Sequence, residues 1–191
     1  LVALTGDFVY RSARYAEQCA QELAALESTH GLLACLGNHD LWEDAPLITQ
    51  ALTGAGIKVL VNAGMSLADG ALWVAGVDDV WSGQPDLDAA LDGASSEATV
   101  ILLAHEPDYA DVVSGHGGVS LQLSGHSHGG QVRMPIIGSP ILPYLGQRYP
   151  IGLYHIGELV LYTNRGIGTT YPPVRFNCRP EVTLIVLAGK L

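Results

Sequence analysis

The sequence predicts an α/β domain with more than one sheet. Short apolar runs of strand length, each bounded by Gly, Asp, Asn or His, alternate with stretches whose apolar residues have helical spacing. Near the C-terminus two strand-like runs follow one another without a helix between them, which favours a mixed sheet, or two packed sheets, over a purely parallel one. The chain has 191 residues, of which 48% are hydrophobic. This composition suits a single domain over residues 1–191 with a sizeable core.

Strands are expected in six apolar runs, at residues 1–4, 32–36, 59–61, 72–75, 100–103 and 121–123, and in two later runs, at residues 158–163 and 182–187. Helices are expected at residues 12–26, 46–52 and 107–113. The second helix has a proline in its first turn and Asp44 as a candidate cap, and Gly54 and Gly56 are placed to end it.

Charge and cysteine content exclude several classes of protein. The formal net charge is −10, from 19 acidic and 9 basic residues, and non-specific nucleic-acid binding needs a basic face. We therefore expect no nucleic-acid-binding surface, and we predict no protein partner. A phosphate substrate stays compatible with this charge because bound metal ions supply positive charge. The 3 cysteines are too few and too scattered for a disulfide scaffold or a zinc ribbon.

No targeting segment is visible in the sequence. No apolar run approaches the roughly 18 residues of a membrane-spanning helix, and no signal peptide is recognisable. The chain starts inside an apolar run and without a methionine, so we expect a fragment or a processed chain that has lost targeting information. A cytoplasmic or membrane-peripheral location is favoured.

Metal-competent side chains follow four of the predicted strands. Gly6-Asp7 follows the first run, Gly-Asn-His-Asp at 37–40 the second, His105 the fifth, and Gly-His-Ser-His-Gly-Gly at 125–130 the sixth. The carboxyl ends of strands form the ligand crevice of α/β folds, so these loops are expected to converge. His126 and His128, two residues apart on an extended segment, would project to the same side. A mixed shell of carboxylate, amide and imidazole suits Mn, Fe, Zn or Co better than Ca.

The order Gly-Asp, Gly-Asn-His-Asp, His and Gly-His-x-His resembles the calcineurin-like metallophosphoesterase superfamily, from Leu1 to the end of the His-rich loop. The tail, with Asn-Arg-Gly-Ile-Gly at 164–168 and Arg-Phe-Asn-Cys-Arg-Pro-Glu at 175–181, resembles its bacterial YkuE/YaeI-type branch. The resemblance implies a four-layer α/β/β/α sandwich with two mixed β-sheets. It also implies a two-metal enzyme, manganese among its metals, that hydrolyses phosphomonoesters or phosphodiesters through a metal-bridging hydroxide.

The same resemblance implies the metal ligands. Asp7 would bridge the two divalent ions through its carboxylate, and His128 would bind the first ion. The second ion would be completed by Asn38, His105 and His126. The superfamily normally opens with an Asp-x-His motif on a strand before the Gly-Asp strand, and this chain contains none. We therefore expect the fold to lack its first strand, the first metal site to be incomplete, and the chain as given to be a defective catalyst.

The resemblance gives His39 a role outside the metal shell. His39 would act as the general acid that protonates the leaving-group oxygen, and Asp40 would hold His39 in the right tautomer and favour its charged form. An arginine would add a donor to the phosphate, with Arg165 as the first candidate and Arg133 as the second. A solvated surface is the alternative for the arginines of the last third.

The sequence leaves open several alternatives for the function and for individual segments. The chain could be a metal-binding scaffold without turnover, or, within the enzyme class, a UDP-diacylglucosamine pyrophosphate hydrolase. The apolar segment 134–145 is either an ordinary buried loop or a loop that meets a membrane or an acyl chain. Asp78 and Asp79 either support the metal ligands or are solvated or capping residues, and Trp42 and Trp81 could line a substrate rim.

Overall fold

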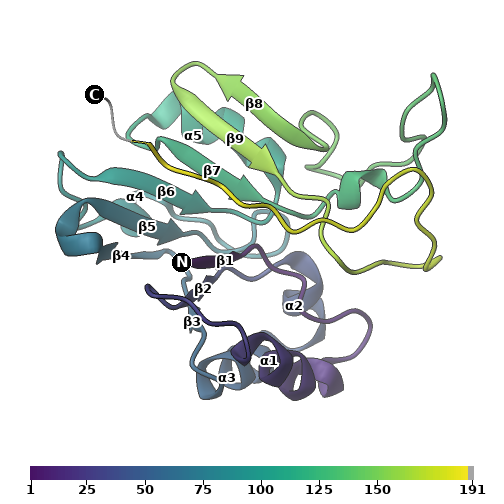
Figure 1. Cartoon of the computed structure of the whole chain (residues 1–191), viewed down its shortest axis with the longest axis horizontal. Coiled ribbons are helices and arrows are strands. Elements are labelled where there is room, and N and C mark those ends of the chain that lie inside the picture. Colours follow the sequence, from purple (N-terminus) through teal and green to yellow (C-terminus); the bar gives the residue numbers. More distant parts are fainter. Residues whose placement is uncertain (189–191) are drawn as a thin grey trace.

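The computed structural model describes residues 1–188 as two facing β-sheets with helices on their outer sides (Figure 1). The smaller sheet is parallel, in the order β1 (Val2–Leu4), β2 (Leu32–Ala34) and β3 (Lys58–Val59). The larger sheet has the order β4 (Ala63–Leu67), β5 (Leu72–Gly76), β6 (Thr99–Leu103), β7 (Leu121–Ser124), β9 (Leu159–Thr163) and β8 (Gly152–Ile156). Its four central strands are parallel and its two edge strands antiparallel. The predicted architecture of two packed sheets is therefore confirmed, but only the larger sheet is mixed.

Helices cover the outer face of each sheet. The smaller sheet carries α1 (Ala16–Ala24) and α3 (Ala45–Gly54), which pack on each other below it in Figure 1, and α2 (Asn38–Glu43) lies beside α3. The larger sheet carries α4 (Leu87–Leu91) and α5 (Ala110–His116). Asp44 caps α3 as expected, because its carboxylate accepts the Leu47 N–H at 3.0 Å. No helix within residues 1–188 is long and apolar enough to cross a lipid bilayer.

Strand alternation produces the four layers. Successive side chains of a strand point to opposite faces, and in β2 Leu32 and Ala34 pack in the core cluster beneath α1 and α3. Leu33 faces the other way and joins Val74 and Leu103 in a cluster between the two sheets. A third cluster fills the space between the larger sheet and its helices. Each sheet is thus apolar on both faces, which is why the sequence shows continuous apolar runs.

Some predicted elements differ from the structure. The strand expected at 182–187 is wrong: the segment is irregular, and Val182 and Leu184 are 90% and 89% exposed. Apolar character alone does not make a strand, because the backbone also needs a hydrogen-bonded neighbour. The edge strands β4 and β8, and the helix α2 over the Asn-His-Asp segment, were not among the predicted elements.

We predict that the contact between the sheets is a main source of stability. Leu103 is fully buried between them, and Leu103→Ala should lower the free energy of unfolding by about 2–5 kcal/mol, because it removes apolar contacts and leaves a cavity. Val112, which is 56% exposed on α5, provides the control, and Val112→Ala should change stability by about 0.5 kcal/mol or less. Urea denaturation followed by circular dichroism measures both. Equal losses for the two variants would contradict the packing described.

Candidate metal centre

The structure brings side chains from distant parts of the chain to one point. One ligand atom each from Asp7, His105 and His126 lies within 4.8 Å of the other two. His105 Nε2 is 3.2 Å from Asp7 Oδ2, and the rings of His105 and His126 are 4.9 Å apart. His128 has no ligand atom within 4.8 Å of those of all three residues. Asp7 follows β1 of the smaller sheet, whereas the two histidines follow β6 and β7 of the larger one, so the cluster spans both sheets.

Backbone carbonyls fix the tautomers of the two clustered histidines. His105 Nδ1 lies 2.5 Å from the Thr5 carbonyl, and His126 Nε2 lies 2.7 Å from the Tyr144 carbonyl. A ring nitrogen that faces a carbonyl must carry the proton, which leaves the other nitrogen of each neutral ring with a lone pair. Carbonyl partners of this kind are typical of metal-binding histidines.

The residues present fit a divalent metal ion. Among the described residues, the buried polar atoms without a hydrogen-bond partner include one atom from each of four predicted ligands: Asn38 Oδ1, His105 Nε2, His126 Nδ1 and His128 Nδ1. The 3.2 Å approach of His105 Nε2 to Asp7 lacks hydrogen-bond geometry. Buried polar atoms nearly always have a partner, and an ion would supply it. Carboxylate, amide and imidazole donors suit Mn, Fe, Zn or Co.

Unusual backbone conformations aim these side chains. Asp7, His126 and His128 have φ values of 59°, 62° and 52°, in the left-handed region that non-glycine residues seldom adopt. The expectation that 126–128 is extended is therefore wrong, since β7 ends at Ser124 and His128 opens a short 3₁₀ turn, His128–Gly130. The flanking glycines of the sequence were the signal for this turn. Such strain is common at functional sites.

Close approach of two loops requires glycine at position 37. A Cβ added there would lie 2.4 Å from Asp7 Oδ1 and 2.7 Å from His105 Cε1, which real side chains do not tolerate. The glycine of the Gly-Asn-His-Asp segment therefore leaves the space that the Asp7 carboxylate and the His105 ring occupy.

Asp40 has a different role from the expected one. Its fully buried carboxylate accepts the backbone N–H groups of Gly37 and Asp7 at 2.9 Å each and that of Phe8 at 2.8 Å. Among residues 1–188 it makes no hydrogen bond to the His39 ring, so the predicted orientation of His39 by Asp40 is corrected. The reason is local: Asp40 lies in the first turn of α2, and its side chain folds back to cap the helix at Gly37. Burial and the nearby Asp7 charge raise the pKa of Asp40 to about 6.

His39 lies at the edge of the cluster. Its half-buried ring packs edge-on against Tyr10 and Trp42, with 4.9 Å between ring centroids in each case. Its backbone N–H donates to Asp7 Oδ1 at 3.0 Å. Burial lowers the pKa of the ring, and the Asp7 carboxylate opposes this effect. The general-acid role stays a prediction.

The Asp7 carboxylate is ionised at the point where a cation would bind. Burial by itself lowers the pKa of His105, but Asp7, Glu106 and the Thr5 carbonyl together raise it to about 10. Burial alone would raise the pKa of Asp7, and His105 and His39 hold it well below its usual range. Burial lowers the pKa of His128 to about 4. In the absence of metal a proton on His105 balances Asp7, and a divalent ion would displace it.

The two candidate phosphate-binding arginines are engaged with protein groups. Arg165 forms an ion pair with Glu181, and Arg133 Nη1 donates to the Gly129 carbonyl at 3.2 Å and to Ser139 Oγ at 3.3 Å. Both lie close to the His-rich loop, and contact with substrate stays a prediction for each.

Sequence patterns gave no role to Arg175 and Cys178, which hold the His-rich loop in place. The Arg175 guanidinium donates to the His128 carbonyl at 3.2 Å and to the Arg165 carbonyl at 2.7 Å. The buried Cys178 thiol donates to the same His128 carbonyl at 3.2 Å. In the sequence, these two residues were marked only by the resemblance of the segment 175–181 to the YkuE/YaeI-type branch. The tail therefore fixes the backbone of a predicted metal ligand.

A buried carboxyl pair supports the loop after β5. Glu106, directly after His105, accepts the Val80 N–H at 3.1 Å, and Asp79 accepts the Ser82 N–H at 2.6 Å. Both carboxyls are fully buried. Burial and Glu106 raise the pKa of Asp79 to about 8, so the pair holds one proton at neutral pH. The supported loop carries Trp81, whose ring is 5.8 Å from that of His126. Asp79 therefore lies behind the site, which is the position that its predicted role as a support for the metal ligands requires.

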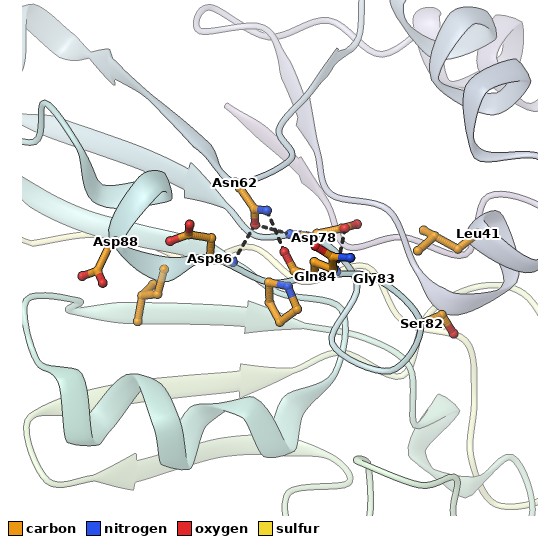
Figure 2. A pocket seen from close by; sticks show the side chains of 10 residues that line it. Leu41, Asn62, Asp78, Ser82, Gly83, Gln84, Asp86 and Asp88 are labelled. Carbon is orange, nitrogen blue, oxygen red and sulfur yellow. Dashed lines mark hydrogen bonds between the residues drawn. The ribbon is translucent and has the colours of Figure 1, made fainter.

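A pocket of about 870 Å³ lies next to this loop (Figure 2). Its walls include the carboxylates of Asp78, Asp86 and Asp88. Asn62 organises the wall, because its side chain accepts the N–H groups of Asp78 and Asp86 at 2.9 Å each. Three carboxylates repel a phosphate group, so we place the candidate phosphate site at the histidine cluster and not in this pocket.

Two facing sheets whose strand ends bring a carboxylate, an amide and imidazoles together are typical of metal-dependent α/β hydrolases. Comparison with known families gives the family itself: the profile described as calcineurin-like phosphoesterase matches residues 1–130. The chain belongs to the calcineurin-like phosphoesterase family. It is therefore a hydrolase of phosphate esters, and the family implies the use of divalent metal.

Individual relatives agree with this assignment. The chain is 37% identical over 193 residues to the metallophosphoesterase YkuE of Bacillus subtilis, covering 98% of this chain and 67% of the relative. It is also 37% identical over 195 residues to phosphodiesterase YaeI of Escherichia coli, covering 98% of this chain and 70% of the relative. A transmembrane protein with a metallophosphoesterase domain from Danio rerio is 30% identical over 202 residues, which cover 98% of this chain and 45% of that protein. The predicted resemblance to the YkuE/YaeI-type branch is confirmed.

The Asp79–Glu106 pair predicts a dependence of stability on pH. Because the pKa of Asp79 is raised from 3.8 to about 8 on folding, the folded state retains a proton that the unfolded state releases, so stability falls as pH rises from about 4 to about 8. Asp79→Asn replaces the shared proton with an amide N–H and should flatten this fall. Melting temperatures measured from pH 4 to pH 9 should show the variant gaining on the parent as pH rises. Parallel curves would show that Asp79 does not carry the proton.

Proposed function

We propose that the histidine cluster is the site at which the protein hydrolyses a phosphomonoester or phosphodiester. Asp7, Asn38, His105 and His126 would hold one divalent ion, and Asp7 and His128 would contribute to a second. The observation that supports this proposal most strongly is the set of buried ligand atoms that lack a hydrogen-bond partner. When bound, divalent ions lower the pKa of an attacking water and neutralise charge on the phosphoryl oxygens.

The residues around the cluster have separable tasks in this proposal. Thr5 and Tyr144 hold His105 and His126 in the tautomers that leave the inner nitrogens free. Asp40 keeps the Asp7 loop in place. His39, beside the cluster and outside the ligand set, would donate a proton to the leaving-group oxygen. Its lowered pKa in the free protein would rise when a negatively charged phosphate binds, which brings the ring toward the working range of a general acid.

The organic part of the ester would lie against an aromatic edge of the site. Trp81 packs edge-on with Trp42, Tyr144 and His126, at centroid distances of 5.0, 5.5 and 5.8 Å. Trp42, Trp81 and Tyr144 are 50%, 39% and 59% exposed, so they offer apolar surface at the mouth of the cluster. This edge, together with the similarity to phosphodiesterase YaeI, favours a diester with an apolar or aromatic group, and a UDP-diacylglucosamine pyrophosphate is one such candidate.

The test is hydrolysis of an aryl phosphomonoester and a bis-aryl phosphodiester by the full-length protein with Mn, Fe, Zn, Co or Mg. His39→Ala should lower turnover by about 10²–10⁴-fold with unchanged metal content, because His39 is not a ligand. His105→Ala should lose both metal and turnover. His155→Ala, at an exposed histidine of β8, is the control and should change neither. Elemental analysis accompanies the kinetics.

Two outcomes would overturn parts of this proposal. Loss of metal in His39→Ala would move that ring into the ligand set. Tight metal binding without hydrolysis of either ester class, with every metal tested, would favour the alternative of a scaffold without turnover.

A further inference from the structure

Two loops near the histidine cluster expose large apolar side chains. In the loop 134–145, Ile136, Ile137 and Ile141 are 107%, 76% and 80% exposed, so the first of the two alternatives for this segment, an ordinary buried loop, is wrong. Isoleucine is among the residues most often buried. A short turn, closed by the pairing of Met134 with Gly138, holds Ile136 and Ile137 away from the body of the protein.

The second loop, 167–176, lies at the same end of the molecule. Ile167, Tyr171 and Phe176 are 68%, 69% and 52% exposed. The Arg133 N–H donates to the Phe176 carbonyl, and the Phe176 N–H donates to the Gln131 carbonyl, at 2.9 Å each. This pairing ties the bases of the two loops together, and in Figure 1 both extend beyond the sheets on the right of the view.

Charge is distributed unevenly in a way that sets these loops apart. Residues 131–180 contain five arginines and one acidic residue, Glu158, whereas the rest of the chain contains the other 4 of the 9 basic residues and the other 18 of the 19 acidic residues. Arg148 and Arg165 are neutralised by Asp111 and Glu181, so the positive charge beside the loops comes from Arg133, Arg175 and Arg179, in an otherwise acidic protein. Arg179 is exposed beside the second loop, and Arg133 lies at the base of the first. A negatively charged partner is attracted by this segment and repelled by the acidic rest of the chain.

We propose that the loops 134–145 and 167–176 dock the protein on an anionic lipid surface. The isoleucines would enter the boundary between headgroups and acyl chains, and the exposed Arg179 would face the lipid phosphates, the combination that binds peripheral proteins to membranes. Projecting loop tips suit insertion into a fluid surface, whereas a protein partner requires a complementary face of about 800 Å². The Tyr144 carbonyl of the first loop holds His126 at 2.7 Å, so the docked surface adjoins the metal centre.

Docking is independent of the proposed chemistry and is tested without it. The chain is sedimented with vesicles of phosphatidylcholine alone and of phosphatidylcholine with phosphatidylglycerol. Binding is expected only to the anionic vesicles and should weaken as salt is added. The double variant Ile136→Ser/Ile141→Ser should bind at least about tenfold more weakly, because the apolar insertion is lost.

The matched control is Val112→Ser/Leu153→Ser, which removes apolar side chains that are 56% and 59% exposed on α5 and β8 and should bind vesicles like the parent. Circular dichroism checks that every variant folds. A single variant, Ile136→Trp, gives a second readout, since its fluorescence should shift to shorter wavelength on anionic vesicles. Equal binding by the loop variant and the control would overturn the proposal. So would no binding by the parent, or a dimer in solution that the loop substitutions abolish.

Discussion

The burial of the Asp40 carboxylate among backbone amides is the interaction on which the geometry of the site depends. A buried carboxylate is costly unless it is fully hydrogen-bonded, and here N–H groups from two separate loops supply the bonds: Gly37 from the loop after β2, and Asp7 and Phe8 from the loop after β1. The bonds hold Asp7 in a left-handed conformation that it would otherwise seldom adopt. One side chain outside the ligand set thus determines where the predicted bridging carboxylate lies.

The site also depends on how the two sheets pack. Asp7 and Asn38 follow strands of the smaller sheet, whereas His105 and His126 follow strands of the larger sheet. The relative position of the two halves is set by the core between the sheets, in which Leu33 meets Val74 and Leu103. Because interiors are close-packed, a shift in this core moves one half of the site against the other. Stability and metal geometry are therefore coupled through the same apolar contacts.

The sequence predicted the site well where a metal-competent side chain directly follows an apolar run of strand length. Asp7, His105 and His126 each follow an apolar run, and this shared position at strand ends predicted that they would meet. Sequence patterns did not predict contacts between residues that are far apart in the chain and meet only after folding. Nothing in the sequence near Asp40 indicates that its carboxylate turns back to the Asp7 loop, and Arg175 acts on His128 from 47 residues away. The segment 182–187 shows the converse, because its strand-like composition has no neighbouring strand to complete it.

We propose that four side chains from the two sheets hold one divalent ion. Anomalous diffraction from crystals soaked in Mn²⁺, recorded near the manganese absorption edge, tests it directly. We expect a peak bounded by the Asp7 carboxylate, Asn38 Oδ1, His105 Nε2 and His126 Nδ1, at metal–ligand distances of about 2.0–2.3 Å. A peak that excludes either histidine, or no peak at the cluster at saturating Mn²⁺, would contradict it.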